Sequence, residues 1–132
     1  MARLRFALLT LLILLAPVSA TEISGSWKMS FKATWTRIPD LVCTLSQKDQ
    51  RLDGTCKAAG GDDGKGVDLS DGRIEGDRVS WSWKVVVPDG VTWTYAFTGT
   101  LDANGTAMKG IVKLSAGAGA KENEASFTAT KD

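Results

Sequence analysis

Carboxylates are the side chains most suited to acid–base chemistry here, because the chain contains no histidine, the commonest general base near neutral pH. Four of them gather around a glycine-rich stretch at residues 60–66, namely Asp62, Asp63, Asp68 and Asp71. Their spacing matches neither an EF-hand nor a glycine-aspartate repeat. A solvated polar loop is the plainer interpretation, and calcium binding is the alternative. We therefore expect a protein that is not an enzyme and has no cofactor and no metal.

Aromatic residues are more informative, with five Trp, one Tyr and four Phe in the chain. On the inner face of a small β-barrel, such residues either fill the core or line a pocket for a planar apolar ligand or a sugar face. The predicted ligand-binding residues are aromatic, with one polar side chain among them: Trp35, Trp81, Trp83, Trp93, Tyr95, Phe97, Phe31 and Gln47. The sequence leaves a packed core and a ligand cavity as open alternatives.

The elements that must position these residues are strands, because apolar and polar residues alternate repeatedly after residue 20. Eight strands are expected, at residues 24–36, 41–48, 51–58, 67–75 with a kink at Asp71-Gly72, 77–87, 91–102, 106–115 and 124–131. Closing the sheet on itself covers its apolar face and removes its edges. The sequence therefore predicts an all-β domain, an eight-stranded antiparallel up-and-down β-barrel, with a β-sandwich as the alternative.

The predicted connections are of two kinds. Tight turns are expected at Asp49-Gln50, Gly76-Asp77 and Asn104-Gly105, and looser connections at 39–40, 60–66, 88–90 and 116–122. An up-and-down meander places all the looser connections at one end of the barrel. We expect this end to be a candidate mouth, with Trp35, Trp83, Trp93 and Tyr95 towards it and Trp27 towards the other end.

Cys43 and Cys56 are the only two cysteines. A two-residue turn at Asp49-Gln50 pairs Lys48 with Arg51, and counting outward places the two cysteines directly opposite each other. Cross-strand Cβ atoms lie about 4.5–5.5 Å apart, close enough for a disulfide after slight adjustment. Two free thiols or a metal pair are the alternatives, although a metal pair would want histidine or further thiols. We expect a structural disulfide that contributes roughly 3 kcal/mol.

The first twenty residues have the pattern of a signal peptide. Arg3 and Arg5 give a positive start, residues 6–15 form an apolar run broken only by Thr10, and small residues at 18–20 precede Thr21. The run is shorter than the roughly 20 residues that span a bilayer, which disfavours an uncleaved anchor. We expect cleavage before Thr21, a single domain at 21–132, and a secreted or periplasmic location without membrane association after cleavage.

The charge balance bears on the partners of the mature chain. It has fourteen basic and fifteen acidic residues, a net charge of −1, so no strong field attracts nucleic acid. We therefore expect no nucleic-acid partner. The oligomeric state is left open, although Val86 and Ile111 are apolar residues on the outward face that could meet a neighbouring barrel.

Several short motifs follow one another in order along the mature chain: Gly25-Ser26-Trp27, Leu52-Asp53-Gly54-Thr55, Trp83-Lys84, Phe97-Thr98-Gly99, Asp102 with Asn104-Gly105, and Phe127-Thr128-Ala129-Thr130. This series resembles the avidin-like branch of the calycin barrels, whose final strand carries a Trp-Lys-Ala-Thr motif. The resemblance implies an eight-stranded barrel. It also implies that Trp83 and Phe97 match aromatic walls of the avidin pocket.

The polar half of a biotin site departs from the family pattern. Met29 and Ala33 stand where that family has Asn and Ser, and Cys56 stands where it has Tyr. Trp93 and Tyr95 replace hydroxyl-bearing residues, Val112 replaces a Trp, and the chain ends before the last Asn or Asp. A ureido ring buried without these partners would lose several hydrogen bonds, each costly for a buried group. The resemblance therefore supports the fold and argues against biotin.

Three functions stay open. The first is a secreted or periplasmic binding protein with an aromatic-lined cavity for a small apolar or planar ligand other than biotin. The second is an interaction module with an extracellular protein partner, such as a hydrolase or protease inhibitor. Ile23-Ser24-Gly25-Ser26-Trp27 resembles the start of protease-inhibitor barrels, although only residues 21–24 precede the barrel. The third is a structural envelope protein with a filled barrel.

Overall fold

The computed structural model describes residues 22–35, 37–60, 66–117 and 122–132. The strands are β1 (Gly25–Lys32), β2 (Leu41–Lys48), β3 (Arg51–Ala58), β4 (Val67–Asp68), β5 (Ser70–Glu75), β6 (Arg78–Val86), β7 (Thr92–Leu101), β8 (Ala107–Ala116) and β9 (Asn123–Lys131). No helix occurs in the described ranges, and none there is long and apolar enough to cross a membrane. The predicted signal peptide, residues 1–20, lies outside the described residues.

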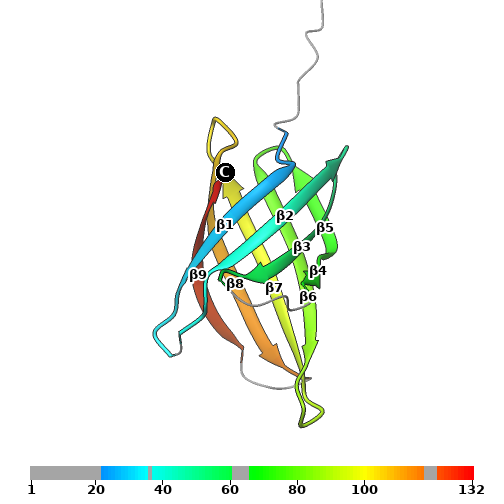
Figure 1. Ribbon diagram of the computed structural model, residues 1–132, viewed down its shortest axis with the longest axis vertical. Helices are drawn as coiled ribbons and strands as arrows, with labels where there is room; N and C mark the ends of the chain where they lie inside the picture. The colour runs from blue at the N-terminus through cyan, green and yellow to red at the C-terminus, as the bar shows by residue number, and fades with distance from the viewer. Residues whose placement is uncertain (1–21, 36, 61–65, 118–121) are drawn as a thin grey trace, which may run out of the picture.

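The long strands form a closed antiparallel barrel (Figure 1). Consecutive strands pair along the meander, and β1 closes the barrel by pairing with β9 from Trp27↔Lys131 to Lys32↔Ser126. Closure joins the first and last strands of the sheet, which would otherwise be edges with unpaired backbone groups. The predicted eight-stranded antiparallel barrel is confirmed in preference to the sandwich.

The fourth predicted strand is kinked, as the sequence indicates. Both β4 and β5 pair with β3, and the register of β5 against β6 shifts between Ser70 and Arg73. Asp71 has a φ of 53°, in the left-handed region. A Cβ atom on Gly72 would collide with the backbone carbonyl oxygen of Leu52, so β5 can approach β3 this closely only with glycine at 72. The two-residue β4 is a short additional strand beside the eight of the barrel.

The apolar residues of each strand point into the barrel and form its core. The core consists of buried hydrophobic residues from every long strand and from the segment before β1. They are Ile23, Trp27, Met29, Cys43, Leu45, Leu52, Cys56, Ile74, Val79, Trp81, Trp83, Phe97, Leu101, Met108, Val112, Leu114, Ala125, Phe127 and Ala129. Val86 and Ile111 are exposed on the outer face, where the alternation predicts them. Burying each large side chain contributes about 1.5–3 kcal/mol, so period-2 patterning sets the register of the whole barrel.

The hairpin of β2 and β3 has the predicted register. Lys48 pairs with Arg51 across the turn at Asp49-Gln50, and Cys43 pairs with Cys56. The two sulfurs form a disulfide inside the barrel, where both cysteines are buried. The predicted disulfide is confirmed, and it is compatible with an oxidising extracellular or periplasmic compartment.

The two ends of the barrel differ. The turns at 49–50, 76–77 and 102–106 lie at one end together with residues 22–24 and the C-terminus, here called the closed end. Ile23 is fully buried at this end. Residues 33–35 and 37–40 and the connection at 87–91 lie at the opposite end, here called the open end (Figure 1). The other two looser connections contain residues outside the described ranges.

Strand β1 is shorter than the sequence predicts. Alternation continues to residue 36, but the strand ends at Lys32. Pairing with β2 stops at Met29, and pairing with β9 stops at Lys32, so the chain beyond has no backbone ladder to hold it extended. Trp35 consequently leaves the inward face, and 42% of its surface is exposed.

Candidate functional site

Six inward-facing rings meet in the barrel and are here called the aromatic cluster: Phe31, Trp81, Trp83, Tyr95, Phe97 and Phe127. The Phe97 ring is central, with its centroid 4.5 Å from that of Trp83, 5.1 Å from that of Trp81 and 5.7 Å from that of Phe127. Such separations are typical of favourable aromatic pairs. Five of the predicted ligand-binding residues therefore form one connected cluster.

Strand register explains why these rings meet. On β6 and β7, Trp81 lies opposite Phe97, Trp83 opposite Tyr95, and Val85 opposite Trp93. Across the closure, Phe31 lies opposite Phe127. Inward residues on paired strands are direct neighbours, so alternate aromatic positions become adjacent layers of rings. Phe127 is not among the predicted site residues, although the alternation of apolar and polar residues along β9 puts it on the inward face.

Exposure increases along the barrel towards the open end. Val79, Trp81 and Trp83 on β6 are all buried, with 0%, 3% and 6% of their surfaces exposed. Val85, the next inward residue, is half-buried, as are Trp93 and Tyr95 beside it on β7. The residues around Phe97 are thus buried, whereas the inward-facing rings nearer the open end remain accessible to solvent.

The polar atom of Trp81 is unusual. Among the described residues, its Nε1 atom is buried and has no hydrogen-bond partner. Trp27 donates its Nε1 to the Ile23 carbonyl oxygen at 2.9 Å, and Trp35 donates to the Glu124 carbonyl oxygen at 3.1 Å. Leaving a buried donor unpaired costs about 1–3 kcal/mol. A hydrogen-bond acceptor placed beside Trp81 Nε1 would therefore stabilise the cluster.

Three other predicted site residues lie apart from the aromatic pairs. Trp93 packs half-buried against the core near the open end. Trp35 lies outside the strands and is anchored at the surface by Glu124. Gln47 lies at the closed end. Its side-chain Oε1 accepts a hydrogen bond from the Ile23 backbone N–H at 3.1 Å, and its backbone N–H donates to Ser24 Oγ at 2.9 Å. The structure therefore does not bring Gln47 together with the rings.

The interior carries no charge, because no polar or charged residue of the described ranges is buried. The clearest pKa effects lie on the outer surface at the closed end. The backbone N–H of Thr106, with that of Ala107, hydrogen-bonds Asp102 and lowers the pKa of its carboxyl. The hydroxyl and backbone N–H of Ser24 lower the pKa of Glu22. Neither group faces the aromatic cluster, so these carboxylates serve the turn and the N-terminal segment.

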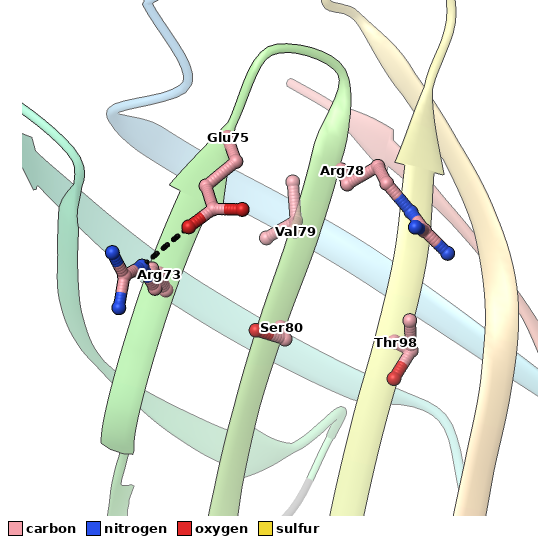
Figure 2. A pocket seen from close by; sticks show the side chains of 6 residues that line it. All are labelled: Arg73, Glu75, Arg78, Val79, Ser80 and Thr98. Carbon is pink, nitrogen blue, oxygen red and sulfur yellow. Dashed lines mark ion pairs between the residues drawn. The ribbon is translucent and has the colours of Figure 1, made fainter.

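A shallow hollow of about 190 Å³ lies on the outer face of β5, β6 and β7 (Figure 2). Its charged groups are largely satisfied, because Arg73 Nε lies 2.8 Å from Glu75 Oε1 and both side chains are more than half exposed. Figure 2 shows the Arg78 guanidinium extending away from this pair. Exposed ion pairs of this kind contribute little, and the hollow gathers no set of side chains for catalysis or specific binding.

Two further hollows also lie away from the aromatic cluster. One of about 340 Å³ is lined by residues around Asp71 and Arg73. The other, of about 270 Å³, lies between the β7–β8 hairpin and β9, beside Met108 and Ala129. None of the predicted ligand-binding residues lines any of these three hollows.

The carboxylates considered for acid–base chemistry are dispersed where they can be described. Asp68 accepts a hydrogen bond from Thr55 Oγ1 at 2.9 Å, and Asp71 occupies the β5 kink. Asp62 and Asp63 lie outside the described residues. Within the described ranges, no three Cys, Asp or Glu side chains form a group that could hold a metal ion.

Comparisons with models of protein families, with curated proteins and with solved structures find no significant match to this chain.

Proposed function

We propose that this protein binds a small, flat and largely apolar molecule at the open end of the barrel. The binding surface would consist of the half-buried inward residues Phe31, Trp93 and Tyr95, backed by Trp83 and Phe97. The observation that supports this proposal most strongly is that solvent exposure of the inward-facing rings increases towards the open end. Rings buried on one side and accessible on the other offer stacking surfaces to a planar guest.

An uncharged lining favours a neutral or weakly polar guest. No charged residue is buried in the described interior, and an ionised group placed there without a partner would be strongly destabilised. The rings of Trp and Tyr give a large contact area at low cost in conformational entropy. The proposal is therefore a binding protein, with no catalytic step assigned to it.

The disulfide and the predicted signal peptide both support the proposal that this protein is exported. A buried Cys43–Cys56 bridge supports folding where disulfides persist, which favours export to the periplasm or the medium. Residues 22–24 are held against the barrel by Gln47, and the Glu22 carbonyl accepts from Lys131 Nζ at 3.3 Å. Because a protease inhibitor would be expected to project this segment, we prefer the small-ligand proposal.

Titration of the mature protein with naphthalene tests this function, followed by tryptophan fluorescence and by the indole N–H resonances. We expect saturable binding that shifts the Trp83 and Trp93 signals most. Val85→Trp, at a half-buried position beside Trp93, should fill the opening and weaken binding by about tenfold or more, the loss of roughly 1.4 kcal/mol.

Ile111→Ala is the matched control, because Ile111 is an exposed apolar residue on the outer face of β8. It should leave naphthalene affinity unchanged. Absence of saturable binding to the wild-type protein, or equal weakening by Ile111→Ala, would contradict a site at the open end.

A further inference from the structure

Trp81 places a lone hydrogen-bond donor deep in the aromatic cluster. Its ring is 3% exposed on the inward face of β6. It stacks on Phe97 with an interplanar angle of 13° and lies 6.2 Å from the Phe127 ring. An indole nitrogen donates and cannot accept. What Trp81 Nε1 lacks is therefore an acceptor, and neither neighbouring ring has one.

The protein itself offers few acceptors at this depth. Trp27 donates to the carbonyl of Ile23, which precedes β1, and Trp35 donates to the carbonyl of Glu124 near the start of β9. On the β7 side of β6 the backbone of Trp81 is paired with Phe97, and on the β5 side the register shifts opposite Trp81. The buried side chains of the described residues are all hydrophobic. The folded chain therefore leaves the Trp81 indole N–H without an acceptor among the described residues.

We propose that the ligand of this barrel carries a neutral hydrogen-bond acceptor, such as a carbonyl oxygen or a pyridine-type nitrogen, that receives the Trp81 N–H. This inference rests on the proposed function and deepens it, because it selects heteroaromatic or carbonyl-bearing rings over plain hydrocarbons. A site that hydrogen-bonds its ligand discriminates strongly against analogues without the bonding group. The acceptor is neutral because no cation is buried among the described residues to balance an anion.

A permanently bound water is the competing partner for Trp81. A buried water is usually held by two to four polar groups. The described interior supplies Trp81 Nε1 as the unpaired buried side-chain atom, which is too few to hold a water firmly. A ligand atom is held in place instead by the rings that stack on the rest of the molecule.

Naphthalene, quinoline and isoquinoline test the inference, since they share one shape and differ in a single ring atom. Their affinities are measured for the wild-type protein and for Trp81→Phe. We expect the preference for the better azanaphthalene over naphthalene to fall by about tenfold in Trp81→Phe. Trp27→Phe is the matched control, because it makes the same change at the closed end and should leave the preference intact.

A second measurement uses the wild-type protein alone and does not depend on how Trp81→Phe folds. The Trp81 indole proton resonance should move downfield with quinoline or isoquinoline and not with naphthalene. An unchanged preference in Trp81→Phe, or a water contact at the Trp81 indole that persists in the complex, overturns the acceptor inference and leaves the proposed function standing. Failure of all three compounds to bind overturns the proposed function itself, and the inference with it.

Discussion

Trp27 donates its indole N–H to the carbonyl oxygen of Ile23, four residues earlier, at 2.9 Å. This bond folds the N-terminal segment over the closed end of the barrel, where Ile23 is fully buried. Trp27 and Trp81 are both buried tryptophans on inward faces, yet one indole is satisfied by the chain and the other is not. The indole N–H at the closed end is thus satisfied by the chain itself, whereas that of Trp81 in the aromatic cluster has no partner among the described residues.

The two tryptophans should respond differently to the same substitution. Trp27→Phe removes a satisfied bond and strands the Ile23 carbonyl, whereas Trp81→Phe removes a donor that has no partner. Both lose a similar ring volume, so the difference isolates the hydrogen bond. We expect Trp27→Phe to lower the free energy of unfolding by about 1–2 kcal/mol more than Trp81→Phe. Urea denaturation of the ligand-free proteins measures this difference, and equal losses would mean that Trp81 has a partner.

Gln47 is expected to act on stability rather than on binding. Its Oε1 accepts the Ile23 N–H, so Gln47→Ala should lower the free energy of unfolding by about 1 kcal/mol. Gln47→Glu keeps an acceptor oxygen and should lose less. Because Gln47 lies at the closed end, naphthalene affinity should be the same in both variants, and a parallel loss of affinity would return Gln47 to the ligand site.

The disulfide should contribute strongly to stability while resisting reduction in the folded state. Cys43 and Cys56 are separated by 13 residues, a loop for which the chain-entropy model gives about 3 kcal/mol. Both sulfurs are buried, with Cys43 Sγ 3.4 Å from Met29 Sδ. We expect Cys43→Ala/Cys56→Ala to shift the urea midpoint markedly. Thiol labelling after reductant should appear only at denaturant concentrations that open the barrel; rapid labelling of the native protein would contradict this burial.

The kink in β5 supplies a paired test of backbone geometry. Gly72→Ala would place a Cβ against the Leu52 carbonyl oxygen, and we expect a loss of about 1–3 kcal/mol, as for overpacked sites. Asp71→Gly removes a side chain from a left-handed residue and should be neutral or slightly stabilising. Thermal denaturation followed by circular dichroism compares the two, and tolerance of Gly72→Ala would place β3 and β5 farther apart.

The Asp102 carboxylate should make the β7–β8 turn sensitive to acid. Hydrogen bonds from the Thr106 and Ala107 N–H groups lower the pKa of Asp102 below its usual 3.8 in the folded protein. The stabilisation is therefore complete above the unfolded-state pKa and is lost as the pH falls through the lower folded-state pKa. Asp102→Asn keeps an acceptor oxygen and should flatten this part of the stability profile below about pH 4.

Local alternation in the sequence determined much of this protein. It placed Trp81, Trp83, Tyr95 and Phe97 on one face of adjacent strands, because side chains alternate across a strand whatever lies beyond it. It paired Cys43 with Cys56, because a two-residue turn fixes every later pair in a hairpin. The same alternation also indicates that Phe127 faces inward on β9.

Tertiary structure decided what depends on where other strands end. Trp35 continues the alternation of β1, but it leaves the inner face because the ladders with β2 and β9 stop before it. Gln47 follows the inward pattern of β2, yet the meander places it at the closed end, where the N-terminal segment folds back to meet it.

The partnering of each indole is decided in the same way. The patterns of Trp27 and Trp81 in the sequence are alike. Only the folded chain brings a carbonyl to Trp27 and leaves Trp81 without one, because hydrogen bonding requires a specific approach of atoms that alternation does not encode.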